Sequence, residues 1–293
     1  MMEKRYNKKR LWALLLVVLV FAFFVMTIYQ NLVVKNIYYT LEYGNLPNDF
    51  SNYRIAQISD LHNATFGKNN AQLINSLGKN QPNIIVITGD LIDSNHIDIE
   101  VAIEFVKQAK KIAPCYFVTG NHEAWIGKKY NELEKELLEQ DVIVLRNENV
   151  SLQHGKSTLE LIGVDDPQFM ERTSMLDQAI MQRKLQEIYV AEDSFKILLS
   201  HRPELFDVYV DHSMDLVLSG HAHGGQFRIP FFGGLVAPNQ GFFPKFDSGI
   251  YEQDNTKMVL SRGIGNSIIP IRINNPPEIV YVDLIQNAGK INK

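Results

Sequence analysis

Five short apolar segments of the chain each run directly into an aspartate, asparagine or histidine, and this repetition constrains the fold most. The segments span residues 53–60, 83–90, 115–123, 195–201 and 214–223. Between them lie stretches with the helical spacing of apolar residues, at 69–80, 97–112, 130–140 and 174–188. Because apolar strands that alternate with helices are buried on both faces, the pattern predicts an α/β fold with a largely parallel sheet covered by helices.

Polar residues gather at the carboxyl ends of these expected strands. Open α/β sheets bind ligands beyond those ends, so side chains that five strands place there would meet in one cleft. Each residue alone has a simpler explanation as a turn or a helix N-cap, but their joint occurrence after five apolar strands is harder to explain that way. The residues concerned are Asp60, His62, Asp90, Asn121, His122, His201, His221 and His223.

Seven of these residues form a donor set of two carboxylates, four imidazoles and one amide. Mixed nitrogen and oxygen donors suit Mn, Fe, Zn or Co, and the lack of thiolate argues against a structural zinc site. Seven donors exceed the needs of one tetrahedral site, whereas two ions about 3.5–4 Å apart that share a carboxylate would use them all. Two divalent ions, two aspartates and a bridging hydroxide leave one positive charge, which would attract a phosphate group.

The polar segments resemble the five sequence blocks of the calcineurin-like metallophosphoesterases, and they occur in the family's order over roughly residues 53–230. Three further segments, GVDD at 163–166, GGQ at 224–226 and the closing SRGIG…PIRINNPPEI, resemble a membrane-associated or exported subgroup. That subgroup includes phosphodiesterases and lipid-precursor pyrophosphatases. The matching blocks are Asp60-x-His62, Gly89-Asp90, Gly120-Asn121-His122-Glu123, His201 and Gly220-His221-Ala222-His223.

This resemblance implies a four-layer α/β/β/α sandwich and assigns a role to each site residue. It implies a first metal ion held by Asp60, His62, Asp90 and His223. It implies a second ion held by Asp90, Asn121, His201 and His221, with Asp90 as the bridge. His122 would face the substrate and stabilise phosphoryl oxygens or protonate the leaving group, and Glu123 would orient His122. A metal-bridging hydroxide would attack phosphorus.

The N-terminal region combines a basic cluster with a long uncharged segment. Five Lys and Arg residues lie within residues 1–10, and the 19 residues at 11–29 carry no charge. As a helix this segment would measure about 28 Å, enough to cross the hydrocarbon core of a bilayer. A cleaved signal peptide is the alternative, but the segment is long for one and no small-x-small cleavage site ends it. We therefore expect a single-pass anchor in the cell membrane, with the N-terminus cytoplasmic and the catalytic domain outside.

The expected domain organisation follows from that anchor. Residues 1–10 form a cytoplasmic basic segment, 11–29 the transmembrane anchor and 30–44 a linker. A single catalytic domain at 45–286 and a short tail at 287–293 complete the chain. The net charge of −4 gives no nucleic-acid-binding signature. Cys115 is the only cysteine, so the chain forms neither an internal disulfide nor a thiolate metal cluster.

Directly after the GHAH motif, residues 227–246 are rich in phenylalanine, glycine and proline. Phenylalanine is usually buried, so the rings could pack into the core beneath the loop. The segment lacks the periodicity of a helix or a strand, however, so some rings could instead line a wall beside the metals or touch the bilayer. The rings belong to Phe227, Phe231, Phe232, Phe242, Phe243 and Phe246.

The sequence predicts a membrane-anchored, dinuclear metal-dependent phosphoesterase, either a phosphodiesterase or a pyrophosphatase. A lipid-linked or cell-envelope phosphoester is one candidate substrate. Two alternatives remain open at this point. The first is a metal-dependent hydrolase of a non-phosphate ester, which a comparison of substrates would distinguish. The second is a non-catalytic binding module on the same fold, against which the complete set of donors argues.

Overall fold

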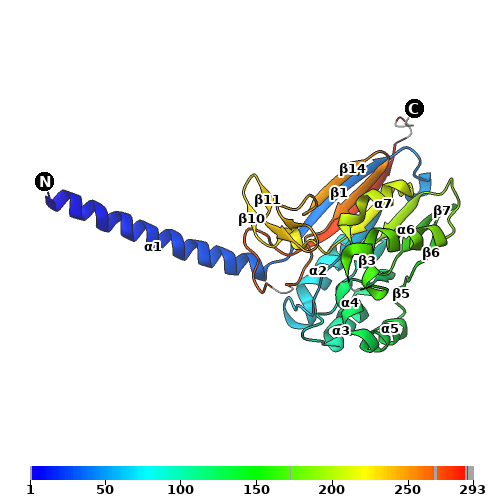
Figure 1. The fold of residues 1–293 in the computed structure, drawn as a ribbon, viewed down its shortest axis with the longest axis horizontal. Helices are drawn as coiled ribbons and strands as arrows, with labels where there is room; N and C mark the ends of the chain where they lie inside the picture. The colour runs from blue at the N-terminus through cyan, green and yellow to red at the C-terminus, as the bar shows by residue number, and fades with distance from the viewer. Residues whose placement is uncertain (1, 172, 267–268, 288, 290–293) are drawn as a thin grey trace.

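Two six-stranded sheets pack face to face and form the body of the protein (Figure 1). The structure is a computed structural model that describes residues 2–171, 173–266, 269–287 and 289. A long N-terminal helix extends from one end of this body (Figure 1). The apolar side chains lie in three layers, one between the sheets and one beneath the helices on each outer face. This is the α/β/β/α arrangement that the sequence predicts.

The first sheet contains strands from both the beginning and the end of the folded body. Its strands are β1 (Lys35–Tyr43), β2 (Tyr53–Ile58), β3 (Ile84–Thr88), β4 (Cys115–Val118), β5 (Ile143–Val144) and β16 (Glu278–Gln286), in the spatial order β1-β16-β2-β3-β4-β5. Strands β2 to β5 run parallel to one another, whereas β16 is antiparallel to β2. Every residue of β3 is buried, as expected for a strand that is covered on both faces.

The second sheet has a parallel centre and two antiparallel edges. It contains β6 (Glu148–His154), β7 (Ser157–Gly163), β8 (Lys196–Leu199), β9 (Leu216–Ser219), β14 (Gly249–Gln253) and β15 (Thr256–Leu260), in the order β14-β15-β9-β8-β7-β6. The pairs β7–β8, β8–β9 and β9–β15 are parallel. The hairpin expected at 151–166 is present as β6 and β7, shifted by about three residues toward the N-terminus.

Helices cover the outer face of each sheet. On the first sheet lie α2 (Ala71–Asn80), α3 (Ile99–Ala109) and α5 (Tyr130–Glu139), and on the second lie α6 (Asp177–Glu187) and α7 (Phe206–Asp211). Their buried residues follow helical spacing, as Leu73 and Leu77 do in α2. Each large apolar side chain buried in this way contributes about 1.5–3 kcal/mol. All four helices expected from the sequence are present, as α2, α3, α5 and α6.

The region expected to be a linker, residues 30–44, contains an edge strand instead. Helix α1 (Met2–Leu32) runs beyond the expected anchor at 11–29, and β1 begins three residues later. Strand β1 pairs in parallel with β16 over its full length, from Lys35 opposite Glu278 to Tyr43 opposite Gln286. The physical reason is an alternation in which Ile37, Tyr39, Leu41 and Tyr43 turn toward the body.

The phenylalanine-rich segment folds into two miniature ribbons. Strand β10 (Arg228–Ile229) pairs with β11 (Gly233–Gly234), and β12 (Val236–Ala237) pairs with β13 (Gly241–Phe242). Strands this short bury little on their own, which agrees with the absence of periodicity in the sequence. The expected tail at 287–293 lies mostly outside the described residues.

Candidate metal centre

The predicted metal ligands lie in turns at the carboxyl ends of β2, β3, β8 and β9 and at the start of the short helix α4 (Asn121–Trp125). Five of them adopt left-handed backbone conformations, with φ between 45° and 69°. Such conformations are uncommon outside glycine and cost about 1–3 kcal/mol each, so they persist where the surroundings enforce them, often at functional sites. The five residues are Asp60, His62, Asp90, His221 and His223.

Two glycines make room for these turns. A β-carbon on Gly120 would collide with the carboxylate of Asp90, and one on Gly220 would collide with Ser59 and with the carboxylate of Asp60. Neither neighbour can move freely, because the carboxylates are fully enclosed. The glycines of the GNHE and GHAH motifs therefore allow the close approach of the backbone to the buried aspartates.

Four of the predicted residues, Asp60, His62, Asp90 and His223, bring their donor atoms within 4.8 Å of one another. The Nε2 atoms of His62 and His223 face each other at 3.2 Å. Nε2 of His223 lies 3.3 Å from Oδ1 of Asp60, and Nε2 of His62 lies 3.5 Å from Oδ2 of Asp90. These are the four residues that the family resemblance assigns to one ion.

A second group shares Asp90 with the first and adds His201 and His221. Nε2 of His201 lies 3.2 Å from Oδ2 of Asp90. Among the described residues, Oδ1 of Asn121 and Nε2 of His201 have no hydrogen-bond partner although both are buried. Buried polar atoms are rarely left unpaired, so these two call for a ligand. A divalent cation fits them, since both atoms have free lone pairs.

The tautomer of His201 strengthens this interpretation. Its Nδ1 lies 2.8 Å from the carbonyl oxygen of Thr88, which can only accept a hydrogen bond, so Nδ1 carries the proton. In the neutral ring, Nε2 then presents a lone pair to the Asp90 carboxylate. Burial alone would lower the pKa of His201, but Asp90 outweighs it and raises that pKa to about 10. The buried Asp90 carboxylate therefore favours a positive charge between itself and His201.

The other imidazoles of the two groups are held neutral. Burial lowers the pKa of His62 to about 3 and also lowers the pKa of His221 and of His223 well below the ordinary value. The positive charge of Arg202 adds to this effect at His221, and His62 and Arg272 add to it at His223. Only a neutral imidazole can bind a metal ion, and these three rings are in that protonation state.

The two aspartates respond differently to the same enclosure. Burial raises the pKa of Asp60 to about 6. At Asp90, burial also acts to raise the pKa, but His201 and His122 outweigh it and hold that pKa well below its usual range. Asp90 lies between the two groups and faces imidazoles on several sides, so it is the carboxylate most suited to contact two cations.

His122 has its proton on the nitrogen that faces the centre. Its Nδ1 accepts a hydrogen bond from the backbone amide of Ser94 at 3.0 Å, so in the neutral ring the proton is on Nε2. That Nε2 lies 4.0 Å from Oδ2 of Asp90. A third acidic group, Asp93, lies 3.5 Å from Nδ1. Because the Nδ1 lone pair is already used, His122 is better placed to donate a proton than to bind a metal.

Glu123 is hydrogen-bonded to backbone amides in the loop of Asp90 and at Gly120. Its carboxylate accepts hydrogen bonds from the backbone amides of Asp90, Leu91, Ile92 and Gly120, at 2.7–3.3 Å. These four bonds use the carboxylate's usual capacity. Burial is the main reason that the pKa of Glu123 rises to about 7. Glu123 therefore supports the loop that carries Asp90, and its role in orienting His122 stays a prediction.

Two buried arginines belong to the site and were not predicted. Arg202 directly follows His201, is fully buried and forms a paired salt bridge with Asp166. Its Nη1 also lies 3.0 Å from Nε2 of His221. Arginine usually lies at the surface, so composition gave no reason to place it here. The sequence signal was its position after a ligand histidine at a strand end.

The second arginine, Arg272, connects the site to helix α1. Its guanidinium donates to the carbonyl oxygens of Arg262 and Gly265 and lies 3.3 Å from Nδ1 of His223. Its backbone amide and carbonyl pair with the side chain of Asn31 at 2.9 and 2.7 Å. Arg272 thus contacts a predicted metal ligand through its side chain and the last turn of α1 through its backbone.

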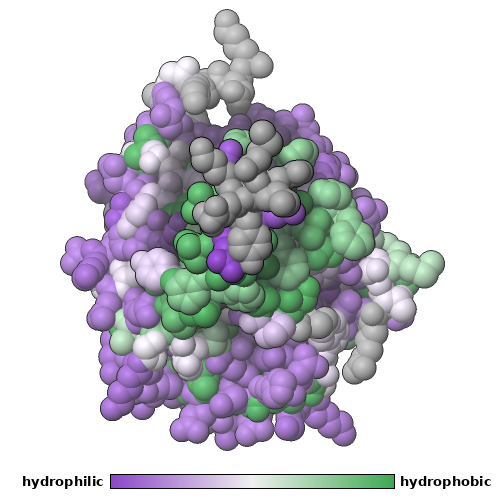
Figure 2. Space-filling view, turned by 90° about the vertical axis from the view of Figure 1, so that its left-hand side faces the viewer, coloured by the Kyte–Doolittle hydropathy of each residue, from purple (hydrophilic) through white to green (hydrophobic). Residues whose placement is uncertain are grey.

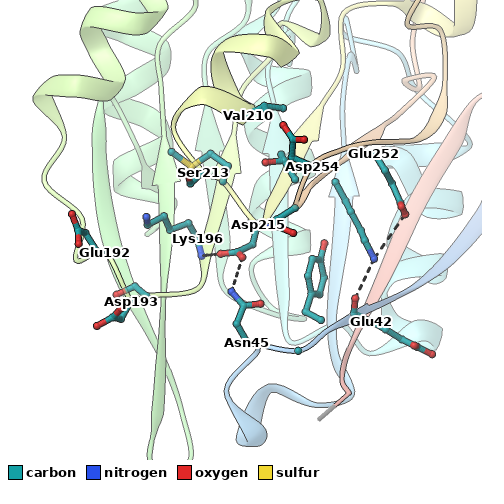
Figure 3. A pocket seen from close by; sticks show the side chains of 17 residues that line it. Glu42, Asn45, Glu192, Asp193, Lys196, Val210, Ser213, Asp215, Glu252 and Asp254 are labelled. Atoms are coloured by element: carbon teal, nitrogen blue, oxygen red, sulfur yellow. Dashed lines mark hydrogen bonds and ion pairs between the residues drawn. The ribbon is translucent and has the colours of Figure 1, made fainter. Parts of the chain in front are cut away.

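A separate cavity lies away from the Asp and His groups. It measures about 870 Å³ and is lined by acidic residues and two lysines near the amino ends of β8 and β9 (Figure 3). Asp215 in its wall accepts hydrogen bonds from Asn45 and from the backbone of Lys196 (Figure 3). Ligands of such sheets bind at the opposite, carboxyl ends of the strands, where the Asp and His groups gather.

A sandwich of this kind with buried Asp and His groups at its strand ends defines a metal-binding α/β protein of hydrolytic type. Residues 53–225 match the model of the calcineurin-like phosphoesterase family, and the chain belongs to this family. The family uses divalent metals, and the protein is accordingly a metal-dependent phosphoric ester hydrolase. This confirms the fold class and the enzyme class expected from the sequence.

Similar proteins occur in distant organisms. The chain is 28% identical over 253 residues to the uncharacterized metallophosphoesterase YkuE of Bacillus subtilis, covering 84% of each. It is 26% identical over 241 residues to the phosphodiesterase YaeI of Escherichia coli, covering 80% of this chain and 82% of that one. It is also 28% identical over 250 residues to a Danio rerio transmembrane protein with a metallophosphoesterase domain, covering 82% of this chain and 55% of that protein.

Helix α1 is the candidate for a membrane span. Its segment Lys8–Leu32 is long and apolar enough to cross a bilayer, and nearly all of it is exposed. A core helix with this composition would be buried. Together with the transmembrane relative, the exposed helix indicates association with a membrane.

Proposed function

We propose that the protein is a phosphodiesterase or pyrophosphatase with a two-ion centre, acting on a phosphoester at the membrane. The observation that carries the proposal is the sharing of Asp90 between two groups of donors, each with buried atoms that need a cation. The first ion would bind Asp60, His62, Asp90 and His223. The second would bind Asp90, Asn121, His201 and His221. Mn, Fe, Zn or Co suits this mixture of donors.

The ions, when bound, would neutralise charge on the phosphoryl group and activate the attacking water. The residues of the chain supply the remaining functions. Asp90 and Asp60 fix the positions of the donors, and Glu123 fixes the loop of Asp90 through four backbone amides. His122 would donate the proton on Nε2 to the leaving oxygen, or a hydrogen bond to a phosphoryl oxygen.

Metal analysis combined with a substrate panel on the full chain tests this proposal. We expect two divalent ions per chain, activity on phosphodiesters or pyrophosphates, loss of activity with a chelator and recovery when metal is added back. Faster cleavage of carboxyl esters than of phosphoesters would favour a non-phosphate ester hydrolase. Stoichiometric metal without turnover of any ester would favour a binding module.

We also propose that α1 stays in the cell membrane as a single span, with the N-terminus in the cytoplasm and the catalytic region outside. The cluster Lys4, Arg5, Lys8, Lys9 and Arg10 before the apolar segment supports this orientation. A protease added to intact cells with an accessible outer membrane face should remove the catalytic region. Protection until lysis would reverse the orientation, and a mature chain without α1 would indicate a cleaved signal peptide.

A further inference from the structure

The phenylalanine-rich segment presents apolar side chains to the outside instead of to the core. Phe231 is 105% exposed and Phe232 is 77% exposed, whereas Phe246 is only 5% exposed. We name the exposed group the aromatic surface. It consists of Ile229, Phe231, Phe232, Phe242, Phe243 and Ile271. We propose that this surface docks into the lipid bilayer beside helix α1 and fixes the distance between the metal centre and the membrane.

Backbone contacts place the aromatic surface next to the end of α1. Asn31 in the last turn of α1 pairs with the backbone of Arg272. The next residue, Ile273, forms a bridge with Phe227 and accepts a hydrogen bond from the amide of Arg228 at 3.0 Å. Helix α1 therefore contacts residues 271–273, and these residues contact β10. The aromatic surface and the apolar helix thus lie at the same end of the molecule.

The figures show the same arrangement. Strands β10 and β11 lie at the end of the body from which α1 extends (Figure 1). Figure 2 views the molecule from that end, with α1 pointing toward the viewer, so the hydrophobic residues toward the middle of the view include those of the helix, and hydrophilic residues lie toward the rim. If α1 crosses a bilayer, this face is the part of the body that meets the membrane surface.

A lipid bilayer suits this surface better than a protein partner does. Phe231 and Phe232 lie in the turn of the first ribbon, and Phe242 and Phe243 lie at the open end of the second. Ribbons with strands of two residues do not provide the closely packed core of a stable protein interface. Two cations lie close by in the sequence, Lys35 just after α1 and Lys245 two residues after Phe243. Exposed rings at the end of an apolar helix, with lysines nearby in the sequence, match the requirements of a bilayer with anionic head groups.

The aromatic surface is rigidly connected to the metal centre. The backbones of Gly225 and Gly234 are in direct contact, so a β-carbon on either glycine would collide with the other. The amide of Leu235 donates to the carbonyl oxygen of Gly225 at 3.1 Å. Gly225 lies two residues after His223, so docking of the ribbons would hold that ligand at a fixed height above the lipid. This part of the inference rests on the proposed function, whereas the docking itself does not.

Spin labels on the full-length protein in vesicles of phosphatidylcholine and phosphatidylglycerol test the docking. Cysteines would replace Phe231 or Phe242 in a Cys115→Ala background, which removes the single native thiol. The matched controls are Ala13→Cys within α1 and Lys135→Cys on α5. The measured quantity is the accessibility of each label to oxygen, which concentrates in lipid, relative to a water-soluble nickel complex.

We expect the ratio at positions 231 and 242 to be several times that at position 135 and to approach the ratio at position 13. Ratios equal to that at position 135 would overturn the proposal. Labels that broaden each other's spectra as the protein density rises would show contact between copies and would also overturn it. Because no substrate is used, a positive result stands even if the protein proves inactive on phosphoesters.

Discussion

The metal centre and the aromatic surface are neighbours along the chain, yet they distribute their side chains in opposite ways. Up to His223 the chain encloses aspartates, histidines and arginines that water would normally solvate. From Ile229 to Phe243 it exposes rings that a core would normally enclose. Both regions depart from the usual rule, in which ionisable groups lie outside and large apolar groups lie inside.

The difference indicates which kind of ligand would stabilise each region. Buried carboxylates and unpaired imidazole nitrogens carry a desolvation cost that a bound cation would offset. Exposed phenyl rings carry a hydration cost that an apolar medium would remove. The two neighbouring regions thus fit two chemically opposite ligands, a divalent ion and a lipid surface.

Asp90→Asn should have the largest effect. It removes the charge shared by both groups of donors, so we expect the bound metal to fall and activity to drop on the order of a thousandfold. Metal analysis and turnover of a small phosphodiester would measure this. The matched control is Asp215→Asn, a carboxylate at the opposite ends of the strands, which should keep both properties. Two ions per chain and full activity in Asp90→Asn would refute the bridging role.

His122→Ala should lower kcat by about 100-fold while leaving the metal content unchanged, since its Nδ1 already binds the amide of Ser94. If the ring protonates the leaving group, esters with good leaving groups should lose less activity than esters with poor ones. Steady-state kinetics with a series of leaving groups would show this. Loss of metal in this variant would place His122 among the ligands instead.

Glu123→Gln should act through metal affinity and not through proton transfer. The amide replaces one of two accepting oxygens and leaves the loop of Asp90 less firmly held, which should weaken metal binding about 10- to 100-fold. Activity at saturating metal should recover substantially, and metal titrations would measure both. A large loss of kcat at saturating metal, with unchanged affinity, would instead support the expectation that Glu123 orients His122.

Asp177→Asn tests a carboxylate that is enclosed without being a predicted ligand. Burial raises its pKa from the ordinary 3.8 to about 6. The folded protein therefore holds this proton more firmly than the unfolded chain does. The free energy of unfolding falls as the pH rises from 3.8 through about 6. Above that window, Asp177→Asn should be more stable by on the order of 1 kcal/mol, and below it the two proteins should be equal. Chelator-treated samples melted in detergent at both pH extremes would decide this, and an equal difference at both would contradict it.

Phe231→Ser/Phe232→Ser should change the stability least, by about 0.5 kcal/mol or less, because both rings are exposed. The matched control, Phe246→Ser, removes a buried ring and should cost about 3–5 kcal/mol. Turnover of a small soluble phosphodiester should persist in the double variant, and turnover of a long-chain phospholipid-like substrate should fall. Equal loss on both substrates would argue that the rings serve the fold.

The sequence pointed to the cluster of Asp and His residues because histidine and aspartate are conspicuous directly after apolar strands, and the fold brings those residues together. The sequence carried no signal for contacts between distant segments. Glu123 follows His122 in the chain, yet its carboxylate turns to the amides of residues 90–92. Arg272 gives no periodic or compositional signal, and only the tertiary fold brings it to His223.

The exposed rings and strand β1 illustrate a second limit. The composition of residues 227–246 left both core packing and exposure open, and the structure shows that Phe246 is buried whereas four other rings are exposed. The alternation in β1 is readable as a strand, but its position directly after an apolar helix suggested a linker. A strand whose only partner comes from the far end of the chain has no local signal for that pairing.

The pairing of Asn31 with Arg272 bears on how the protein can be prepared for study. A soluble fragment that starts at residue 45 would lack both Asn31 and strand β1, leaving an open edge on β16. Removing these residues to gain solubility would also remove a support of Arg272, which contacts His223. Weak metal binding by such a fragment would reflect the loss of this support. The activity of the intact enzyme should therefore be measured on the full chain.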